Sequence, residues 1–247
     1  MAADLAVIVT ARNEAGRLGA TLRALHETFP GADLWVADDA SEDATAAVAA
    51  DAGARVLTAP ERLGKGGAAT LAAEALLREA DPTVLFADAD LGDSAAKLRA
   101  LVDAVSSAPA AGDAATADAP AGAAADAGSA PAADLAIAAF ANRVGGGFGI
   151  AVGASRWAIR RATGRTMQAP MSGQRAMRPG VLSQLLPFAS GFGIETGMTI
   201  DALNRGLRVV EVEVDLEHRA SGKSLRGFAH RGRQARDALR AYASRRS

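Results

Sequence analysis

Short apolar runs alternate with longer stretches of helical pattern through the first half of the chain. Such runs predict buried strands. They lie at residues 5–10, 34–37, 55–59 and 84–87. The stretches rich in Ala and Leu that predict helices lie at residues 18–29, 44–52 and 68–80. Strand and helix in alternation predict an α/β fold with a mostly parallel sheet, in which ligands bind beyond the carboxyl ends of the strands.

The second half continues this pattern after a break in composition. Residues 107–134 are almost entirely Ala, Pro, Gly, Asp, Ser and Thr, with no large apolar side chain. Such a segment buries too little surface to offset its ordering entropy, so we interpret it as a flexible surface insert. Further strands are expected at residues 135–140, 174–177 and 207–214, and helices at 95–106, around 196–205 and in the tail. The pattern assigns no element to the Gly-rich stretch 145–149 or to the basic segment after it. We expect one domain over residues 1–220 and a basic C-terminal helix over 221–247.

Composition narrows the class of protein. The 247 residues have a net charge of −1, which argues against a general nucleic-acid binder. The absence of cysteine excludes disulfides, zinc–thiolate sites and thiol nucleophiles. The chain shows no secretory signal and no uncharged apolar run of roughly 18 residues that would span a bilayer. We therefore expect a cytoplasmic protein, with peripheral contact at the inner membrane face left open.

Polar side chains follow the first two expected strands. Asn13 and Glu14 come after the first, and Asp38 and Asp39 end the second. Side chains at such strand ends can hydrogen-bond a base and a ribose. The alternative is local, because Ser41 or Asp43 can cap the next helix.

A Gly-Lys-Gly segment precedes the third expected helix. Gly64 and Gly66 permit close approach of the backbone, and Lys65 between them supplies a positive charge near a helix N-terminus. Together these features can hold a phosphate, although the spacing is not that of a P-loop. The alternative is a flexible turn with a surface lysine.

The sharpest chemical signal is Asp88-Ala89-Asp90, directly after an apolar run. Residues two apart on a strand share a face, so both carboxylates can approach one hard cation. Mg²⁺ and Mn²⁺ prefer such oxygen ligands and can bridge to substrate phosphates. The alternative is a solvated loop.

Four segments in this order resemble elements of the family 2 glycosyltransferases. Residues 7–14 resemble the opening strand and Asn-Glu turn, and residues 36–45 the nucleotide-binding Asp-Asp-x-Ser-x-Asp-x-Thr element. Residues 63–68 resemble the Gly-Lys-Gly segment, and residues 88–91 the metal-binding Asp-x-Asp. The resemblance implies a three-layer GT-A (Rossmann-like) α/β fold with a mostly parallel central sheet.

The second half resembles the polyprenyl-phosphate sugar transferase and glucosyl-3-phosphoglycerate synthase branches. The matching segments are residues 172–178, with the pattern Ser-Gly-x-Arg, residues 193–195, with Gly-Ile-Glu, and residues 218–224, with Arg-x-x-Gly-x-Ser. In the phosphoglycerate branch a histidine near the last segment completes the metal shell, which makes His218 a candidate ligand. The alternative for His218 is an ordinary histidine at a strand end.

The resemblance implies metal-dependent sugar transfer from a UDP- or GDP-sugar, with inversion by single displacement. The residues implied in nucleotide-sugar binding are Ala11, Asn13, Glu14, Asp38, Asp39, Lys65 and Asp88. Those implied in Mg²⁺ or Mn²⁺ binding are Asp88, Asp90 and His218. Catalytic roles fall to Asp90 and to Glu195, which acts as a general base or binds the acceptor. Residues implied in binding a polyprenyl phosphate or a small phosphorylated acceptor are Arg175, Arg219 and Lys223, whose alternative is solvated surface charge.

Two other functions compete with this hypothesis. A sugar-phosphate nucleotidyltransferase usually has a Gly-rich loop after its first strand, where this chain has residues 11–14, Ala-Arg-Asn-Glu. A non-catalytic nucleotide-sugar-binding protein would not need the Lys65, Asp88 and Asp90 that this chain retains. Release of nucleoside diphosphate with and without Mn²⁺ separates the three.

Overall fold

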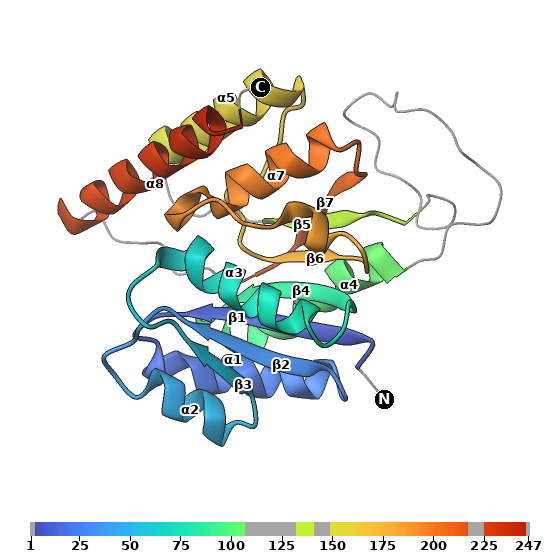
Figure 1. Cartoon of the computed structure of the whole chain (residues 1–247), viewed down its shortest axis with the longest axis vertical. Helices are drawn as coiled ribbons and strands as arrows, with labels where there is room; N and C mark the ends of the chain where they lie inside the picture. Colours follow the sequence, from blue (N-terminus) through green and yellow to red (C-terminus); the bar gives the residue numbers. More distant parts are fainter. Residues whose placement is uncertain (1–2, 107–131, 141–148, 217–224, 246–247) are drawn as a thin grey trace.

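The computed structural model describes residues 3–106, 132–140, 149–216 and 225–245, with backbone alone at 140 and over 225–231. The strands of this part form one sheet in the order β3-β2-β1-β4-β6-β5-β7 (Figure 1). Their bounds are β1 Leu5–Ala11, β2 Asp33–Asp38, β3 Arg55–Thr58, β4 Thr83–Asp88, β5 Leu135–Phe140, β6 Arg175–Met177 and β7 Val209–Val214. Strand β6 runs antiparallel to β4 and β5, and the other pairs are parallel. The expected mostly parallel sheet is confirmed.

Helices cover both faces of the sheet and complete three layers (Figure 1). The α-helices are α1 Ala15–Thr28, α2 Thr45–Asp51, α3 Gly64–Leu77, α4 Arg99–Ser106, α5 Gly149–Thr163, α6 Leu182–Leu185, α7 Ile194–Asn204 and α8 Leu225–Ala243. The 3-10 helices in this described part are η1 Gly92–Leu98 and η2 Gly191–Gly193. One core cluster joins α1, α2 and α4 to the sheet, and the other joins α3, α5, α7 and α8 to its opposite face.

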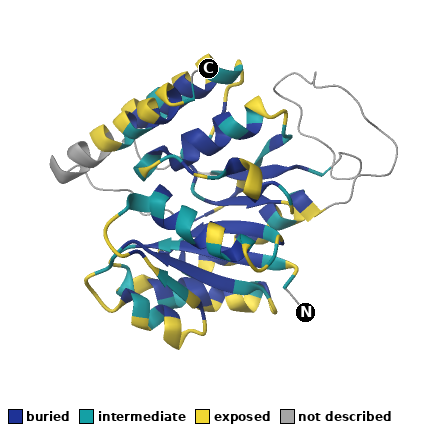
Figure 2. Ribbon diagram, in the orientation of Figure 1, coloured by how far each residue is buried: buried dark blue, intermediate teal, exposed yellow. Residues whose placement is uncertain are grey.

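The apolar runs are continuous because both faces of the central strands are buried (Figure 2). In β1, Ile8 packs into the core on the α3 side, while Val7 and Val9 pack on the α1 side. In β4, Phe86 and Leu85 divide in the same way. The sheet therefore lies in the middle of the molecule. The edge formed by the carboxyl ends of its strands opens between the two helical layers.

The expected strands and helices are confirmed with shifts of a few residues at their ends, except that the first residues of the helix expected at 95–106 belong to η1, and the pattern missed α5 and α6. The face that α5 buries consists of Ala151, Ser155, Ala158 and Ile159. These positions have helical spacing, but three of the side chains are small, so the apolar signal in the sequence is weak. Helix α8, expected from the basic tail, packs against α5, α7 and η2. No helix among the described residues is both long and apolar enough to cross a membrane. The proposed flexible insert, residues 107–134, lies outside the described part over 107–131 and stays a prediction there, together with the domain division. Its last residues belong to the packed structure, because Ala133 and Asp134 are buried and Asp134 accepts a hydrogen bond from the backbone N–H of Arg208.

Candidate active site

The carboxyl ends of β2, β1 and β4 lie next to one another along one edge of the sheet. Asp38 at the end of β2 pairs in register with Ala11 at the end of β1. On the other side of β1, Thr10 pairs with Asp88 at the end of β4. Three segments that are far apart in the sequence therefore meet at the edge where ligands of parallel sheets bind.

The loops after β1 and β2 are tied together by hydrogen bonds around Asn13. The backbone N–H of Asn13 donates to Ser41 Oγ at 2.9 Å, and Asn13 Oδ1 accepts from the N–H of Glu42 at 2.8 Å. Asn13 and Ala40 both have positive φ, at 55° and 52°. Positive φ is uncommon without glycine and costs conformational energy, so the surrounding contacts hold these two turns in shape.

Asp43 connects the start of α2 to the start of α1. Its Oδ1 accepts from the backbone N–H of Thr45 at 3.0 Å, and its Oδ2 from that of Ala15 at 3.2 Å. The hydrogen bond from the Thr45 hydroxyl lowers the pKa of Asp43, and the backbone donors add to this effect. Asp43 therefore binds the N–H of the first residue of α2, although the N-cap position itself belongs to Ala44, and the same side chain also connects the two loops.

Buried Asp39 joins the loop after β2 to the Gly-Lys-Gly segment. Its Oδ1 accepts from the backbone N–H groups of Leu63 and Gly64, at 2.7 and 2.9 Å. Gly64 has a φ of +75°, a conformation that favours glycine. Its neighbour Asp38, also buried, accepts a hydrogen bond from Ser41. Both Asp side chains thus stabilise the strand-end loops.

Glu14 and Asp90 bring negative charge to the open side of the site. Burial raises the pKa of Glu14, and the charge of Asp90 raises it further, while Arg17 lowers it. Arg17 pairs with Glu14 at 2.9 Å. Asp90 is exposed, in the turn after β4. Two neighbouring carboxylates repel each other, so a cation between them and the donor phosphates would be stabilised.

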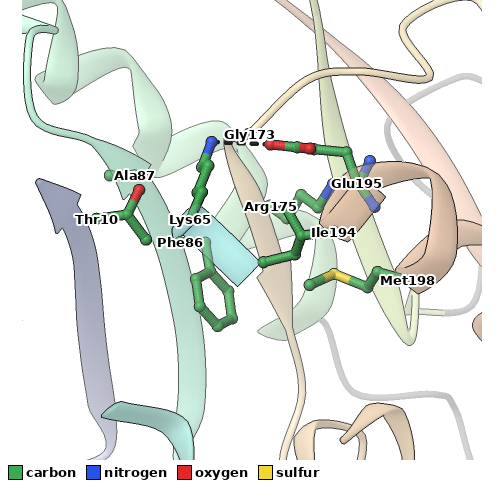
Figure 3. Close-up of a pocket in the computed structure, with 9 residues that line it drawn as sticks. All are labelled: Thr10, Lys65, Phe86, Ala87, Gly173, Arg175, Ile194, Glu195 and Met198. Carbon is green, nitrogen blue, oxygen red and sulfur yellow. Dashed lines mark hydrogen bonds and ion pairs between the residues drawn. The ribbon is translucent and has the colours of Figure 1, made fainter. Parts of the chain in front are cut away.

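Lys65 lies at the centre of the site and bridges two carboxylates, one of which, that of Glu195, is seen beside it in Figure 3. Its Nζ donates to Asp88 Oδ1 at 2.7 Å and to Glu195 Oε1 at 2.8 Å. Burial alone lowers the pKa of Lys65, but the charges of Asp88 and Glu195 outweigh it and raise the pKa above its ordinary value. The lysine is therefore a fixed positive charge, and its interpretation as a surface residue of a flexible turn is wrong.

Gln174 and Gly173 also shape the surroundings of Asp88, and the sequence did not single them out. Gln174 Nε2 donates to Asp88 Oδ2 at 2.6 Å, and Ser172 Oγ donates to Gln174 Oε1 at 3.1 Å. A Cβ at Gly173 would lie 2.5 Å from Lys65 Nζ, so glycine leaves room for the Lys65–Asp88 pair. The Ser-Gly-x-Arg resemblance was the available signal for this segment.

Glu195 lies in the first turn of α7 and is 5% exposed. Lys65 donates to its Oε1, whereas Oε2 is buried and has no hydrogen-bond partner among the described atoms. A small pocket lies beside it, lined also by Thr10, Phe86, Gly173 and Met198 (Figure 3). A buried carboxylate oxygen without a donor is costly, which is typical of a group that acquires its partner when a ligand binds.

Arg175 on β6 is buried behind Glu195, 1% exposed. Its guanidinium donates to the carbonyl oxygens of Ser172 and Pro170 and to Thr199 Oγ1, at 2.8, 3.4 and 3.0 Å. Burial lowers the pKa of Arg175 to about 10, although the charges of Glu195 and Glu211 act in the opposite direction. The group stays charged at neutral pH. Thr199 Oγ1 in turn donates to the backbone carbonyl oxygen of Glu195 at 2.8 Å, so Arg175 supports the first turn of α7 through Thr199. The predicted direct contact with an acceptor stays untested.

The predicted metal site is described only in part. Strand β4 ends at Asp88, and Asp90 belongs to the turn that follows. The strand alternation that was expected to place both carboxylates on one face therefore does not extend to Asp90. No group of three or more potential metal-ligating His, Cys, Asp or Glu side chains occurs among the described residues. His218, Arg219 and Lys223 lie outside them. The oxygen donors of Asp88 and Asp90 suit Mg²⁺ or Mn²⁺.

A family model described as glycosyl transferase family 2 matches residues 6–133. The chain belongs to glycosyltransferase family 2. The matched part of this glycosyltransferase carries the strand-end residues, Lys65 and the Asp-x-Asp segment. Glu195, Arg175 and α8 lie beyond it. No curated protein gives a significant match to the chain.

Solved structures with the same fold include glucosyl-3-phosphoglycerate synthase from Mycobacterium tuberculosis. Its complex with Mn²⁺, UDP and glucosyl-3-phosphoglycerate is 24% identical, with a TM-score of 0.72 over 98% of this chain and 80% of that chain. Its complex with Mn²⁺, UDP-glucose and glycerol 3-phosphate is 24% identical, with a TM-score of 0.70 over 98% and 80%. Its complex with Mg²⁺ and UDP is 22% identical, with a TM-score of 0.71 over 98% and 79%. The expected GT-A fold of this family 2 glycosyltransferase is confirmed.

Proposed function

We propose that this glycosyltransferase transfers a sugar from a UDP-sugar to a small phosphorylated acceptor with the help of a divalent metal ion. The observation that carries the proposal is the cluster of Lys65, Asp88 and Glu195. In this cluster one ammonium group joins the carboxyl end of β4, where we place the donor, to α7. Mycobacterial glucosyl-3-phosphoglycerate synthase, which has the same fold, has been crystallised with UDP-glucose, Mn²⁺ and phosphoglyceric acid. This similarity favours UDP over GDP and a small acceptor over a polyprenyl phosphate.

On the donor side, Asp38, Asp39 and Glu14 would hold the nucleoside. Lys65 supplies a positive charge where the diphosphate would lie, in a site partly shielded from water, and such charge stabilises a leaving group that becomes more negative. Asp88 and Asp90, with His218 as the predicted third ligand, would hold Mg²⁺ or Mn²⁺. The ion would neutralise further charge on the diphosphate.

On the acceptor side, Glu195 is the candidate general base. For a hydroxyl acceptor, the unpaired Oε2 would accept the proton as the hydroxyl oxygen attacks the anomeric carbon. An anionic phosphate oxygen would need no base, and Glu195 would then only position the acceptor. Lys65 holds the carboxylate of Glu195 in place through its hydrogen bond to Oε1.

The predicted inversion is tested by the anomeric configuration of the product. With an α-linked UDP-sugar donor, a single displacement gives the β-glycoside, which ¹H NMR of the anomeric proton identifies. An α-glycoside would contradict the single displacement and remove the role of Glu195 as an in-line base.

Ligand screening tests the donor class directly. UDP-sugars with Mn²⁺ are expected to raise the melting temperature by several degrees, because a ligand that binds only the folded state stabilises it. GDP-sugars are expected to give a smaller shift. Release of UDP that requires both Mn²⁺ and phosphoglyceric acid would support transfer. Pyrophosphate release would instead indicate a nucleotidyltransferase, and a thermal shift without turnover would indicate a binding protein.

The surface of α5 and α8 supports one further part of the proposal, contact with an anionic membrane. The exposed large apolar side chains of the described residues are Ile150, Trp157 and Leu239, all on these two helices. Exposed arginines on the same helices are Arg160, Arg161, Arg233, Arg236 and Arg240. Trp and arginine together are typical of surfaces that lie in a lipid headgroup region.

Vesicle binding tests this contact. The protein is expected to bind anionic vesicles at low salt and to lose binding as salt rises, because surface attraction is screened. Replacing Arg226, Arg233 and Arg240 with glutamine is expected to weaken binding without lowering the melting temperature. If the unmodified protein does not bind anionic vesicles at low salt, membrane docking is excluded.

A further inference from the structure

The segment that leads into Glu195 is packed between α8 and the start of α3. On the α3 side, a Cβ on Gly66 would overlap the carbonyl oxygen of Ala189, and a Cβ on Gly64 would lie 3.2 Å from Gly191 Cα. On the α8 side, a Cβ on Gly193 would lie 2.8 Å from the carbonyl oxygen of Asp237. Backbone therefore lies directly on backbone at both surfaces. A shift of α8 would be transmitted through this layer to the residues around Lys65.

Asp237 makes the polar contact within this layer. Its Oδ2 accepts a hydrogen bond from the backbone N–H of Phe192 at 3.3 Å. The same oxygen lies over Gly191, where an added Cβ would be only 2.5 Å away and where φ is +60°. Asp237 is the single acidic residue in the sequence of α8, and its side chain is 15% exposed. The helix thus places its one carboxylate toward the interior and not toward solvent.

Helix α7 lacks a side-chain cap of its own. Gly193 at its N-cap provides no side chain, and the preceding 3-10 helix also has no side-chain cap bond. The carboxylate of Asp237 satisfies one N–H of this turn from another element and places negative charge near a helix N-terminus, where it is favourable. Glu195 follows in the first turn of α7. The position of its carboxylate therefore depends on how firmly the Gly191–Gly193 turn is held.

A second contact fixes α8 to α7 further along. Arg245 Nε donates to both carboxylate oxygens of Asp201, at 2.8 Å each. A Cβ on Gly197 would lie 3.0 Å from Arg245 Cζ. Helix α8 is therefore anchored to α7 independently of Asp237, so loss of the Asp237 carboxylate loosens the turn without releasing the helix.

We propose that Asp237 is a positioning residue of the transferase. It holds the Gly191–Gly193 turn against α3, so that Glu195 stays at hydrogen-bonding distance from Lys65 and faces the acceptor. This inference rests on the proposed roles of Lys65 and Glu195. It extends the site to the C-terminal helix, beyond the residues that the family model matches.

The test compares Asp237→Ala, Asp237→Asn and a control, Gln234→Ala, one turn earlier on the same helix. Steady-state rates are measured with UDP-glucose, Mn²⁺ and phosphoglyceric acid, and corrected for the folded fraction by circular dichroism. Asp237→Ala is expected to lower kcat about tenfold and to raise the acceptor KM, because small misplacement of a catalytic group is costly. The Kd for UDP with Mn²⁺ should change little, since Asp38 and Asp39 are untouched. Asp237→Asn keeps an acceptor oxygen for the Phe192 N–H and is expected to recover most of the rate.

Hydrogen–deuterium exchange supplies a readout that does not need turnover. Backbone amides of residues 189–195 are expected to exchange faster in Asp237→Ala, and at the unmodified rate in Asp237→Asn and Gln234→Ala. An Asp237→Ala protein with unchanged kcat and acceptor KM would overturn the proposal, as would an asparagine variant as slow as the alanine variant. If the unmodified protein releases no UDP with these substrates, the proposed function has failed, and if Glu195 and Lys65 variants turn over normally, the site roles on which this inference rests have failed. If those variants are slow and Asp237→Ala is not, only the positioning role has failed.

Discussion

Replacing Asp90 with alanine is expected to abolish metal-dependent transfer while leaving the fold intact, and replacing Asp88 to have a similar or lesser effect. Asp90 is exposed and contributes negative charge next to Glu14, so its loss removes a cation ligand without opening the core. Without this ligand the metal ion would be held less firmly. Loss of the positive charge that stabilises the leaving group typically lowers kcat by about 10²–10³-fold. UDP release across a Mn²⁺ titration, with the melting temperature of each variant, measures the effect.

Asp88→Ala requires a separate interpretation because Asp88 also binds Lys65 and Gln174. Its loss leaves Lys65 paired with Glu195 alone, so a change in melting temperature is expected in addition to the loss of rate. The matched control is Asp93→Ala, a neighbouring acidic residue whose side chain is 91% exposed. Wild-type activity in both the Asp88 and the Asp90 variants would refute the assigned metal site.

Glu195→Gln is expected to lower kcat by about 10²–10⁴-fold with a hydroxyl acceptor, the usual contribution of a general base. Glutamine has nearly the same shape, and its amide oxygen can still accept the hydrogen bond from Lys65. Binding of UDP with Mn²⁺ should therefore persist, while transfer fails. Single-turnover measurement of sugar transfer to phosphoglyceric acid separates the chemical step from product release.

The control for this variant is Glu74→Gln, which makes the same chemical change outside the site, at an exposed position on α3. Unchanged kcat in Glu195→Gln, together with a raised acceptor KM, would show that Glu195 binds the acceptor and takes no proton. Such a result would favour an acceptor that attacks through an oxygen that is already anionic.

The part of the site proposed to bind the donor, at the ends of β1, β2 and β4, could be predicted from the sequence. Each of its segments has a signal in neighbouring residues. A buried strand leaves a continuous apolar run, and the polar residues that follow it mark the edge of a parallel sheet. Asn13, Asp38 and Asp88 were identified in this way. The register of β1 with β2 and β4 then brings them together.

The part of the site proposed to bind the acceptor, around Glu195 and Arg175, could be predicted only as a set of separate segments. Resemblance singled out Glu195 and Arg175, but it did not show that Lys65 lies within 2.8 Å of Glu195, 130 positions away in the sequence. It also placed Arg175 among the acceptor ligands, whereas the structure buries its guanidinium against backbone carbonyls. Burial of a charged side chain is invisible to a periodic pattern, because it depends on which other elements pack around it.

The sequence by itself determined the α/β class, the order of most strands and helices, and the residues that end β1, β2 and β4, because hydrophobic periodicity is a property of neighbouring residues. Only the tertiary structure decided that Lys65 pairs with both Asp88 and Glu195, that Gln174 donates to Asp88, and that α8 packs on the turn before Glu195. These contacts join residues from different elements, and their geometry is set by how whole layers pack, which no local spacing along the chain encodes.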